Sequence, residues 1–126
     1  MKYLGIDWGE KRIGLALADG ETRLALPFKT VANLSELEAV VKAEKVTTLV
    51  LGLPLKLSGV GEINPLWQEF KDSLAHKFSL PLDLVDERLS SKGADALVGL
   101  SRDKAARDEV AAAIILQAYL DKLPRE

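Results

Sequence analysis

The chain has 126 residues, 48% hydrophobic and 29% charged, so it can form a core, and we expect residues 1–126 to make a single domain. Lys and Arg number 17 against 19 Asp and Glu, and this net charge of −2 shows no overall basic excess for nucleic acid or membranes. The absence of cysteine excludes disulfides, thiol catalysis and Cys-ligated zinc, and the single histidine, His76, excludes a His-rich metal site.

The first third of the chain predicts three strands. Lys2–Asp7 and Arg12–Ala18 are short, largely apolar runs on either side of Gly9, a pattern typical of a hairpin. Leu24–Phe28 is a third candidate strand, in which Pro27 indicates an edge position or the strand's end.

A helix and a buried strand are expected next. Ser35 and Glu38 have the spacing of a capping box, which predicts a helix that continues to about Glu44. Thr48–Leu53 is an almost uninterrupted apolar run, as expected for a strand buried on both faces.

The second half of the chain predicts further helices and one more strand. Asn64 followed by Pro65 is typical of a helix start, and we expect one apolar stripe on that helix and His76 on its surface. The expected stripe consists of Leu66, Phe70, Leu74 and Phe78. The remaining expected elements are a strand at Leu82–Val85, a short helix at Ser91–Val98 and a last helix from about Asp103 to Lys122, with Val110–Leu116 largely buried. This order predicts an α/β fold in which helices cover both faces of a sheet of mixed direction.

Three carboxylates stand out by their positions. Asp7 ends the first strand, Glu87 follows the last strand, and Asp108 lies in the early turns of the last helix. Each has a plain structural interpretation: Asp7 as the cap of a turn, Glu87 as the ion-pair partner of Arg88, and Asp108 as an acid that favours the helix dipole. Together, however, they can converge at one edge of the sheet, where open α/β sheets bind ligands.

A carboxylate cluster of this kind favours hard divalent cations. Without His or Cys, such ligands prefer Mg²⁺ or Mn²⁺, and two ions can activate a water and stabilise a leaving oxygen in phosphodiester cleavage. Without an ion the like charges would repel one another.

Basic residues gather around the same predicted site, although loops are often basic in any protein. Lys11 and Arg12 flank the first turn, Lys56 lies in the central loop and Arg88 follows Glu87. The others are Lys92, Arg102, Lys104 and Arg107. This distribution favours a polyanionic substrate. Trp8 beside Asp7 is able to stack on a base, but a strand tryptophan is more often part of the core.

Four segments in this order resemble the YqgF-type family of bacterial proteins, described as resolvase-like or as nucleases for the precursor of small-subunit ribosomal RNA. The resemblance extends over nearly the whole chain. The segments are Gly5–Gly14, Leu51–Pro54, Asp86–Ser90 and Asp108–Gln117.

The resemblance implies a ribonuclease-H-like fold with a mixed five-stranded sheet. It places Asp7, Glu87 and Asp108 at the positions of three metal-binding catalytic carboxylates, with Asp7 bridging two Mg²⁺ or Mn²⁺ ions. Arg12 and Arg88 match positions that hold substrate phosphate. The expected function is therefore metal-dependent cleavage of nucleic acid, with pre-16S rRNA as the first choice of substrate and ribosomal particles as possible partners.

Several alternatives stay open at this point. Resolution of a four-way Holliday junction in DNA needs two coordinated active sites and hence a homodimer, whereas a monomer suffices for RNA processing. A non-catalytic, RNA-binding ribosome-assembly factor is a further alternative. Another is a nucleotide-binding ATPase, because actin-like and Hsp70-like proteins open with a similar Gly-Ile-Asp hairpin that holds phosphate. Asp7 stands where a signal peptide would need its apolar stretch, and no apolar run approaches the ~18 residues of a membrane span, so a cytoplasmic protein without membrane contact is expected.

Overall fold

The computed structural model describes residues 1–54, 64–86 and 104–124. These residues form a sheet with the strand order β3-β2-β1-β4-β5 and three helices. The strands are β1 (Lys2–Trp8), β2 (Ile13–Asp19), β3 (Leu26–Val31), β4 (Thr48–Leu53) and β5 (Leu82–Asp86). The helices are α1 (Leu34–Ala43), α2 (Pro65–Lys77) and α4 (Lys104–Asp121). The expected short helix at Ser91–Val98 lies outside the described residues.

The sheet is of mixed direction, as predicted. β2 is antiparallel to both of its neighbours, β1 and β3. On the other side of β1, β4 and β5 continue the sheet parallel to β1. The hairpin around Gly9 is confirmed, because Trp8 faces Ile13 across the pair. β3 forms one edge of the sheet, so the edge position that Pro27 indicated is also confirmed. That strand extends three residues beyond the predicted end, and its pairing with β2 shifts register between Leu15 and Ala16.

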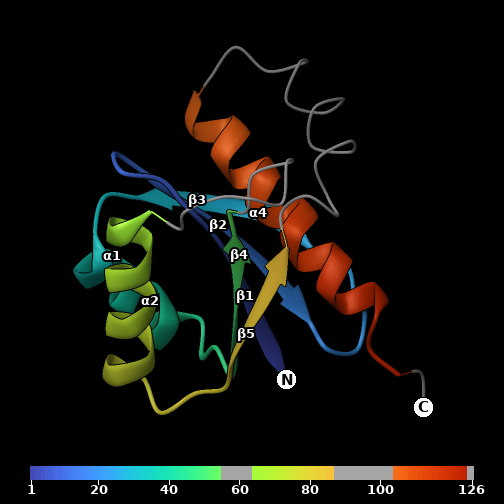
Figure 1. Ribbon diagram of the computed structural model, residues 1–126. Helices are drawn as coiled ribbons and strands as arrows, with labels where there is room; N and C mark the ends of the chain where they lie inside the picture. Colours follow the sequence, from blue (N-terminus) through green and yellow to red (C-terminus); the bar gives the residue numbers. More distant parts are fainter. Residues whose placement is uncertain (55–63, 87–103, 125–126) are drawn as a thin grey trace.

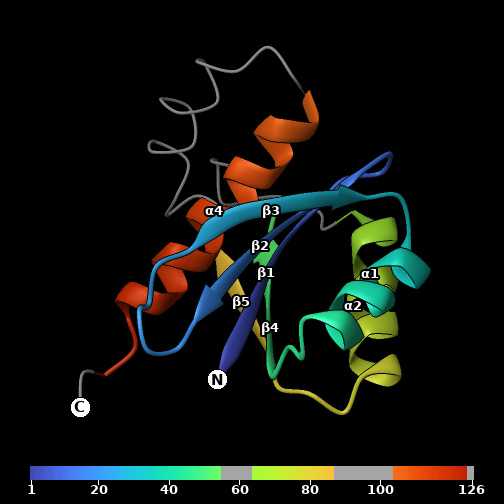
Figure 2. The same ribbon diagram turned by 180° about the vertical axis from the view of Figure 1, so that it is seen from behind.

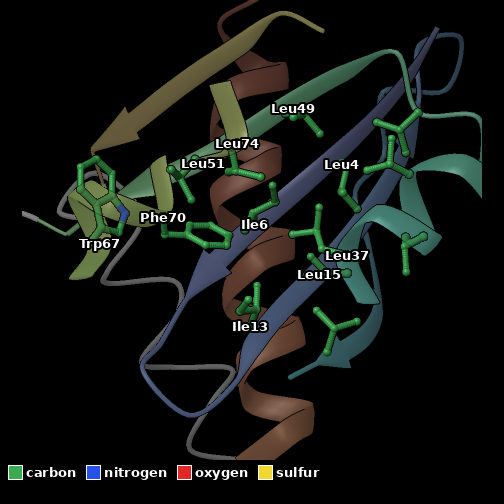
Figure 3. Close-up of a cluster of buried hydrophobic side chains, with 14 residues drawn as sticks. Leu4, Ile6, Ile13, Leu15, Leu37, Leu49, Leu51, Trp67, Phe70 and Leu74 are labelled. Atoms are coloured by element: carbon green, nitrogen blue, oxygen red, sulfur yellow. The ribbon is translucent and has the colours of Figure 1, made fainter. Parts of the chain in front are cut away.

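Helices cover both faces of the sheet (Figures 1 and 2): α1 and α2 lie on one face and α4 crosses the other. The larger core lies under α1 and α2, where side chains of β1, β2 and β4 meet both helices (Figure 3). The second core lies under α4 and contains small residues of β2, Tyr3, and the buried face of the helix. Within the expected buried run of that helix, Ala112, Ala113, Ile115 and Leu116 are buried and the other three residues are half-buried.

The predicted capping box of α1 was wrong by two residues. Asn33 is the N-cap, and its side chain accepts a hydrogen bond from the Glu36 amide at 3.0 Å. Glu36 in turn accepts from the Ala32 amide at 2.8 Å. Asn is as good an N-cap as Ser, and the earlier start lets the helix include Leu34, which packs against the core.

The predicted stripe of α2 was partly wrong. Asn64 caps the helix as expected, accepting from the Leu66 amide at 2.9 Å, but the Leu66 side chain itself is 51% exposed. Trp67 is buried in its place, together with Phe70 and Leu74, because a helix turns once in 3.6 residues and a strict spacing of four drifts off the buried face. The Trp67 indole N–H donates to the Gly52 carbonyl at 3.1 Å and so ties α2 to the end of β4. His76, farther along α2, is exposed, as predicted.

The far end of α4 is held by a tyrosine whose ionisation is suppressed. The Tyr119 hydroxyl donates to Asp83 of β5 at 2.6 Å. Burial, the hydrogen bond and the Asp83 charge together raise the pKa of Tyr119 to about 12 from an ordinary value of 10.0. Because the folded-state pKa is raised, this contribution to stability is complete below pH 10 and is lost as the pH rises from 10 through 12.

We therefore expect Tyr119→Phe to remove a late phase from the absorbance titration of the two tyrosines. The free energy of unfolding of the variant should also fall less steeply than that of the wild type between pH 10 and 12. Equal slopes for the two proteins in that range would contradict the assignment.

No helix in the described ranges is both long enough and apolar enough to span a membrane.

Candidate active site

The predicted site lies at the edge of the sheet where the parallel strands end. β1, β4 and β5 run in the same direction and end at Trp8, Leu53 and Asp86. The β1–β2 hairpin and the first turns of α4 lie at this end of the molecule (Figures 1 and 2). The elements that bear Asp7 and Asp108 therefore meet at one edge of the sheet.

Alternation along β1 directs Asp7 toward α4. Tyr3, on the same face of the strand, packs in the core under that helix, whereas Leu4 and Ile6 point to the opposite core. Across the hairpin, Asp7 is paired with Gly14 of β2.

Two glycines let α4 approach the sheet closely. A Cβ atom at Gly14 would collide with the backbone carbonyl of Asp108 and lie 2.9 Å from its Cβ. A Cβ at Gly5 would lie 2.8 Å from the Ala112 carbonyl oxygen. The backbone of α4 thus rests directly on β1 and β2, and Asp108 is held over the strand position next to Asp7.

Ion pairing fixes the orientation of Asp108. The Arg12 Nε donates to Asp108 Oδ2 at 2.7 Å, and the two side chains are 39% and 29% exposed. On the other side of Gly14, the Thr30 hydroxyl donates to Glu109 at 2.9 Å and ties the same turn of α4 to β3. The first half of α4 is therefore attached to the sheet on both sides of the glycine contact.

A hollow of about 300 Å³ lies between the hairpin and α4. Its walls bring together two predicted carboxylates and two predicted basic residues with an aromatic side chain. The lining residues are Asp7, Trp8, Gly9, Glu10, Lys11, Arg12 and Asp108. A hollow that contains both carboxylates and basic side chains suits a hard cation together with a phosphate.

The other three predicted site residues, Lys56, Glu87 and Arg88, lie outside the described residues. Within the described ranges no group of three or more His, Cys, Asp or Glu side chains is placed to hold a metal ion. What the described part of the site contributes is the pair Asp7 and Asp108. Paired carboxylates are hard oxygen donors, so these residues fit Mg²⁺ or Mn²⁺.

Trp8 belongs mainly to the core. Its ring lies 6.3 Å from that of Phe70, centroid to centroid, and packs against the larger hydrophobic cluster. The core interpretation of this residue is therefore supported, although the residue also lines the hollow.

Sequence reasoning missed the glycines that build the site. Gly5 and Gly14 lie on the face of Asp7, and a run of small residues on one strand face signals a close helix. The pairing of Thr30 with Glu109 spans 79 residues and has no local signal.

Two solved structures share the fold of this chain. RuvC of Thermus thermophilus, solved with a Holliday junction, is 14% identical over 95% of this chain and 93% of its own, with a TM-score of 0.60. The fowlpox virus resolvase, also solved with junction DNA, is 10% identical over 99% of this chain and 100% of its own, with a TM-score of 0.64. At these identities the likeness shows the fold alone, which is the ribonuclease-H-like α/β architecture.

The chain belongs to the RuvX family, whose model is described as a Holliday junction resolvase and matches residues 1–122. A protein of Maridesulfovibrio salexigens named "Putative pre-16S rRNA nuclease" is 40% identical over 95% of this chain and 98% of its own. A protein of the same name from Chloroflexus aurantiacus is 38% identical over 94% of this chain and 85% of its own. The predicted resemblance is confirmed, and the chain is a nuclease of this family.

Proposed function

We propose that the protein hydrolyses phosphodiester bonds with the help of divalent metal ions and that its substrate is the 5′ region of pre-16S rRNA. The observation that supports this most is the joint placement of Asp7 and Asp108 in one hollow with Lys11 and Arg12. The carboxylates suit a cation, and the basic side chains suit the phosphate on which it would act.

The residues have separate roles in this proposal. Asp7 and Asp108 hold Mg²⁺ or Mn²⁺, with Glu87 as a third ligand assigned from the sequence. Two such ions, when bound, supply an activated water and stabilise charge on the leaving oxygen. Hydrolysis then leaves a 5′-phosphate and a 3′-hydroxyl.

The basic residues bind and align the substrate. Lys11 and Arg12 line the hollow, and Lys56 and Arg88 join them by sequence assignment. Phosphate contacts provide most of the sequence-independent affinity for nucleic acid. With a net charge of −2, the chain has little further attraction for RNA, so a ribosomal particle is a fitting partner. Such a role belongs to the cytoplasm.

The family description favours a second substrate, the Holliday junction. Resolution requires two symmetric cuts and therefore two copies of this site. We expect a dimer if junctions are the substrate, whereas a monomer is sufficient for RNA.

A cleavage assay separates these functions. Purified protein is incubated with Mn²⁺ and a labelled pre-16S rRNA fragment, single-stranded RNA, single-stranded DNA or a four-way DNA junction, with EDTA in parallel. Asp7→Asn serves as the control for contaminating nucleases. We expect the rRNA fragment to be cleaved best, and only by the wild type with metal.

The outcomes are distinct. Preferred cleavage of the junction, with a dimer in light scattering, would support resolution instead. Binding of RNA without cleavage of any substrate would contradict the catalytic proposal and favour an assembly factor.

A further inference from the structure

The contact between Arg12 and Asp108 places a permanent cation on a proposed metal ligand. Arg12 lies one residue before β2, and its Nε is 2.7 Å from Asp108 Oδ2, across 96 residues of sequence. A guanidinium is a permanent cation, so Asp108 has a positively charged partner even without a metal ion.

The same carboxylate therefore has two competing uses. Asp108 shares its hollow with Asp7, and two carboxylates at one site need a counter-charge. Arg12 supplies that charge in the present arrangement. A divalent cation at Asp108 would be repelled by the guanidinium. If about 5 Å separates the two charges, the repulsion lowers the affinity for the cation about tenfold even at the dielectric constant of water.

Arg12 also suits a second partner. The bond to Asp108 uses Nε, and among the described residues no hydrogen bond involves the terminal nitrogens of Arg12. A guanidinium can form two parallel hydrogen bonds to a phosphate, and these are stronger than its single bond to the partly exposed Asp108 carboxylate.

We propose that Arg12 is an exchangeable counter-ion that weakens cation binding at Asp108 until a substrate phosphate takes up its guanidinium. This inference rests on the proposed metal site. Cation and phosphate then bind with positive coupling, because each one favours the arrangement in which Arg12 has left the carboxylate. The site would fill with metal mainly when nucleic acid is present.

Metal binding tests the inference without any activity measurement. Mn²⁺ is titrated into the protein and the free ion is followed by its electron paramagnetic resonance signal. We expect Arg12→Gln to bind Mn²⁺ about five- to tenfold more tightly than the wild type, from the removed repulsion. Lys29→Gln is the matched control for the loss of one positive charge, since Lys29 lies on β3, is exposed and does not line the hollow. It should change the affinity less than about twofold.

Sulfate, a stand-in for phosphate, tests the exchange. Sodium sulfate, compared with sodium chloride at equal ionic strength, should tighten Mn²⁺ binding by the wild type and leave Arg12→Gln unchanged. In an Asp108→Asn background, where Arg12 is no longer held by the carboxylate, Arg12→Gln should change the Mn²⁺ affinity less than it does in the wild type. Arg12→Lys keeps the charge but not the planar guanidinium, and its Mn²⁺ affinity should lie between those of the wild type and Arg12→Gln.

The failures are distinguishable. If the wild type binds no Mn²⁺, or if Asp7→Asn binds Mn²⁺ as well as the wild type does, the proposed metal site itself is wrong. If the wild type binds Mn²⁺ and Arg12→Gln binds it equally or more weakly, Arg12 supports the metal ligand rather than competing with the metal, and the inference is overturned. An equal response of both proteins to sulfate would also overturn it.

Discussion

Gly14→Ala should unfold the protein about 10 °C earlier than the wild type, a loss of about 3 kcal/mol in the free energy of unfolding. The added methyl group would collide with the carbonyl carbon and oxygen of Asp108, which are backbone atoms and cannot move aside by a change of rotamer. Either α4 lifts from the sheet or β2 bends, and both movements separate Asp108 from Asp7. Thermal unfolding followed by circular dichroism measures the first effect, and the cleavage assay measures the second.

Gly20→Ala is the matched control for this prediction. Its Cβ would lie 3.3 Å from the Met1 Cβ and 3.4 Å from the Met1 oxygen, at the exposed end of the chain. The N-terminus can shift by a few tenths of an ångström, so we expect a change of less than about 1 kcal/mol. Equal stability losses in the two variants would mean that α4 does not rest on β2 at Gly14.

The positions of the strands along the chain and the mixed direction of the sheet could be predicted because each rests on a local pattern. Thr48–Leu53 is buried at its first five residues, as its apolar run required, and the hairpin around Gly9 fixed the pairing of β1 with β2. The apolar run and the hairpin each depend on residues that are close together in the sequence, so the sequence alone shows them.

Errors arose where two local solutions had similar energies. Asn33 and Ser35 are both good caps, and the packing of Leu34 favours the earlier start. In α2, Leu66 and Trp67 are adjacent apolar residues, and burying the larger ring against β4 removes more surface from water.

The types of residue in the site could be predicted from the sequence, but the contacts between them could not. Asp7, Arg12 and Asp108 were all singled out from the sequence, yet Arg12 was assigned to phosphate and not to Asp108. The pairing joins residues 96 positions apart and follows from the close approach of α4 at Gly14, which no periodicity in either segment encodes.

Asp108→Asn should lower the rate of metal-dependent cleavage by about 1,000-fold, equivalent to about 4 kcal/mol of transition-state stabilisation. The amide keeps the shape of the side chain but loses the charge that would hold the cation. Glu109→Gln, one residue along, is the matched control: Glu109 accepts from Thr30 at 2.9 Å, and a glutamine oxygen can accept the same bond. We expect this variant to retain activity within about threefold.

The stability of Asp108→Asn separates a catalytic role from a structural one. The ion pair with Arg12 is partly exposed and contributes at most about 1 kcal/mol, and its loss is offset because Asp7 no longer shares the hollow with the charge of Asp108. The melting temperature should therefore stay within about 3 °C of the wild type while cleavage is lost. An inactive variant that also melts far below the wild type would show that Asp108 serves the packing of α4. An active variant would contradict the metal site, since no other carboxylate of α4 lines the hollow within the described residues.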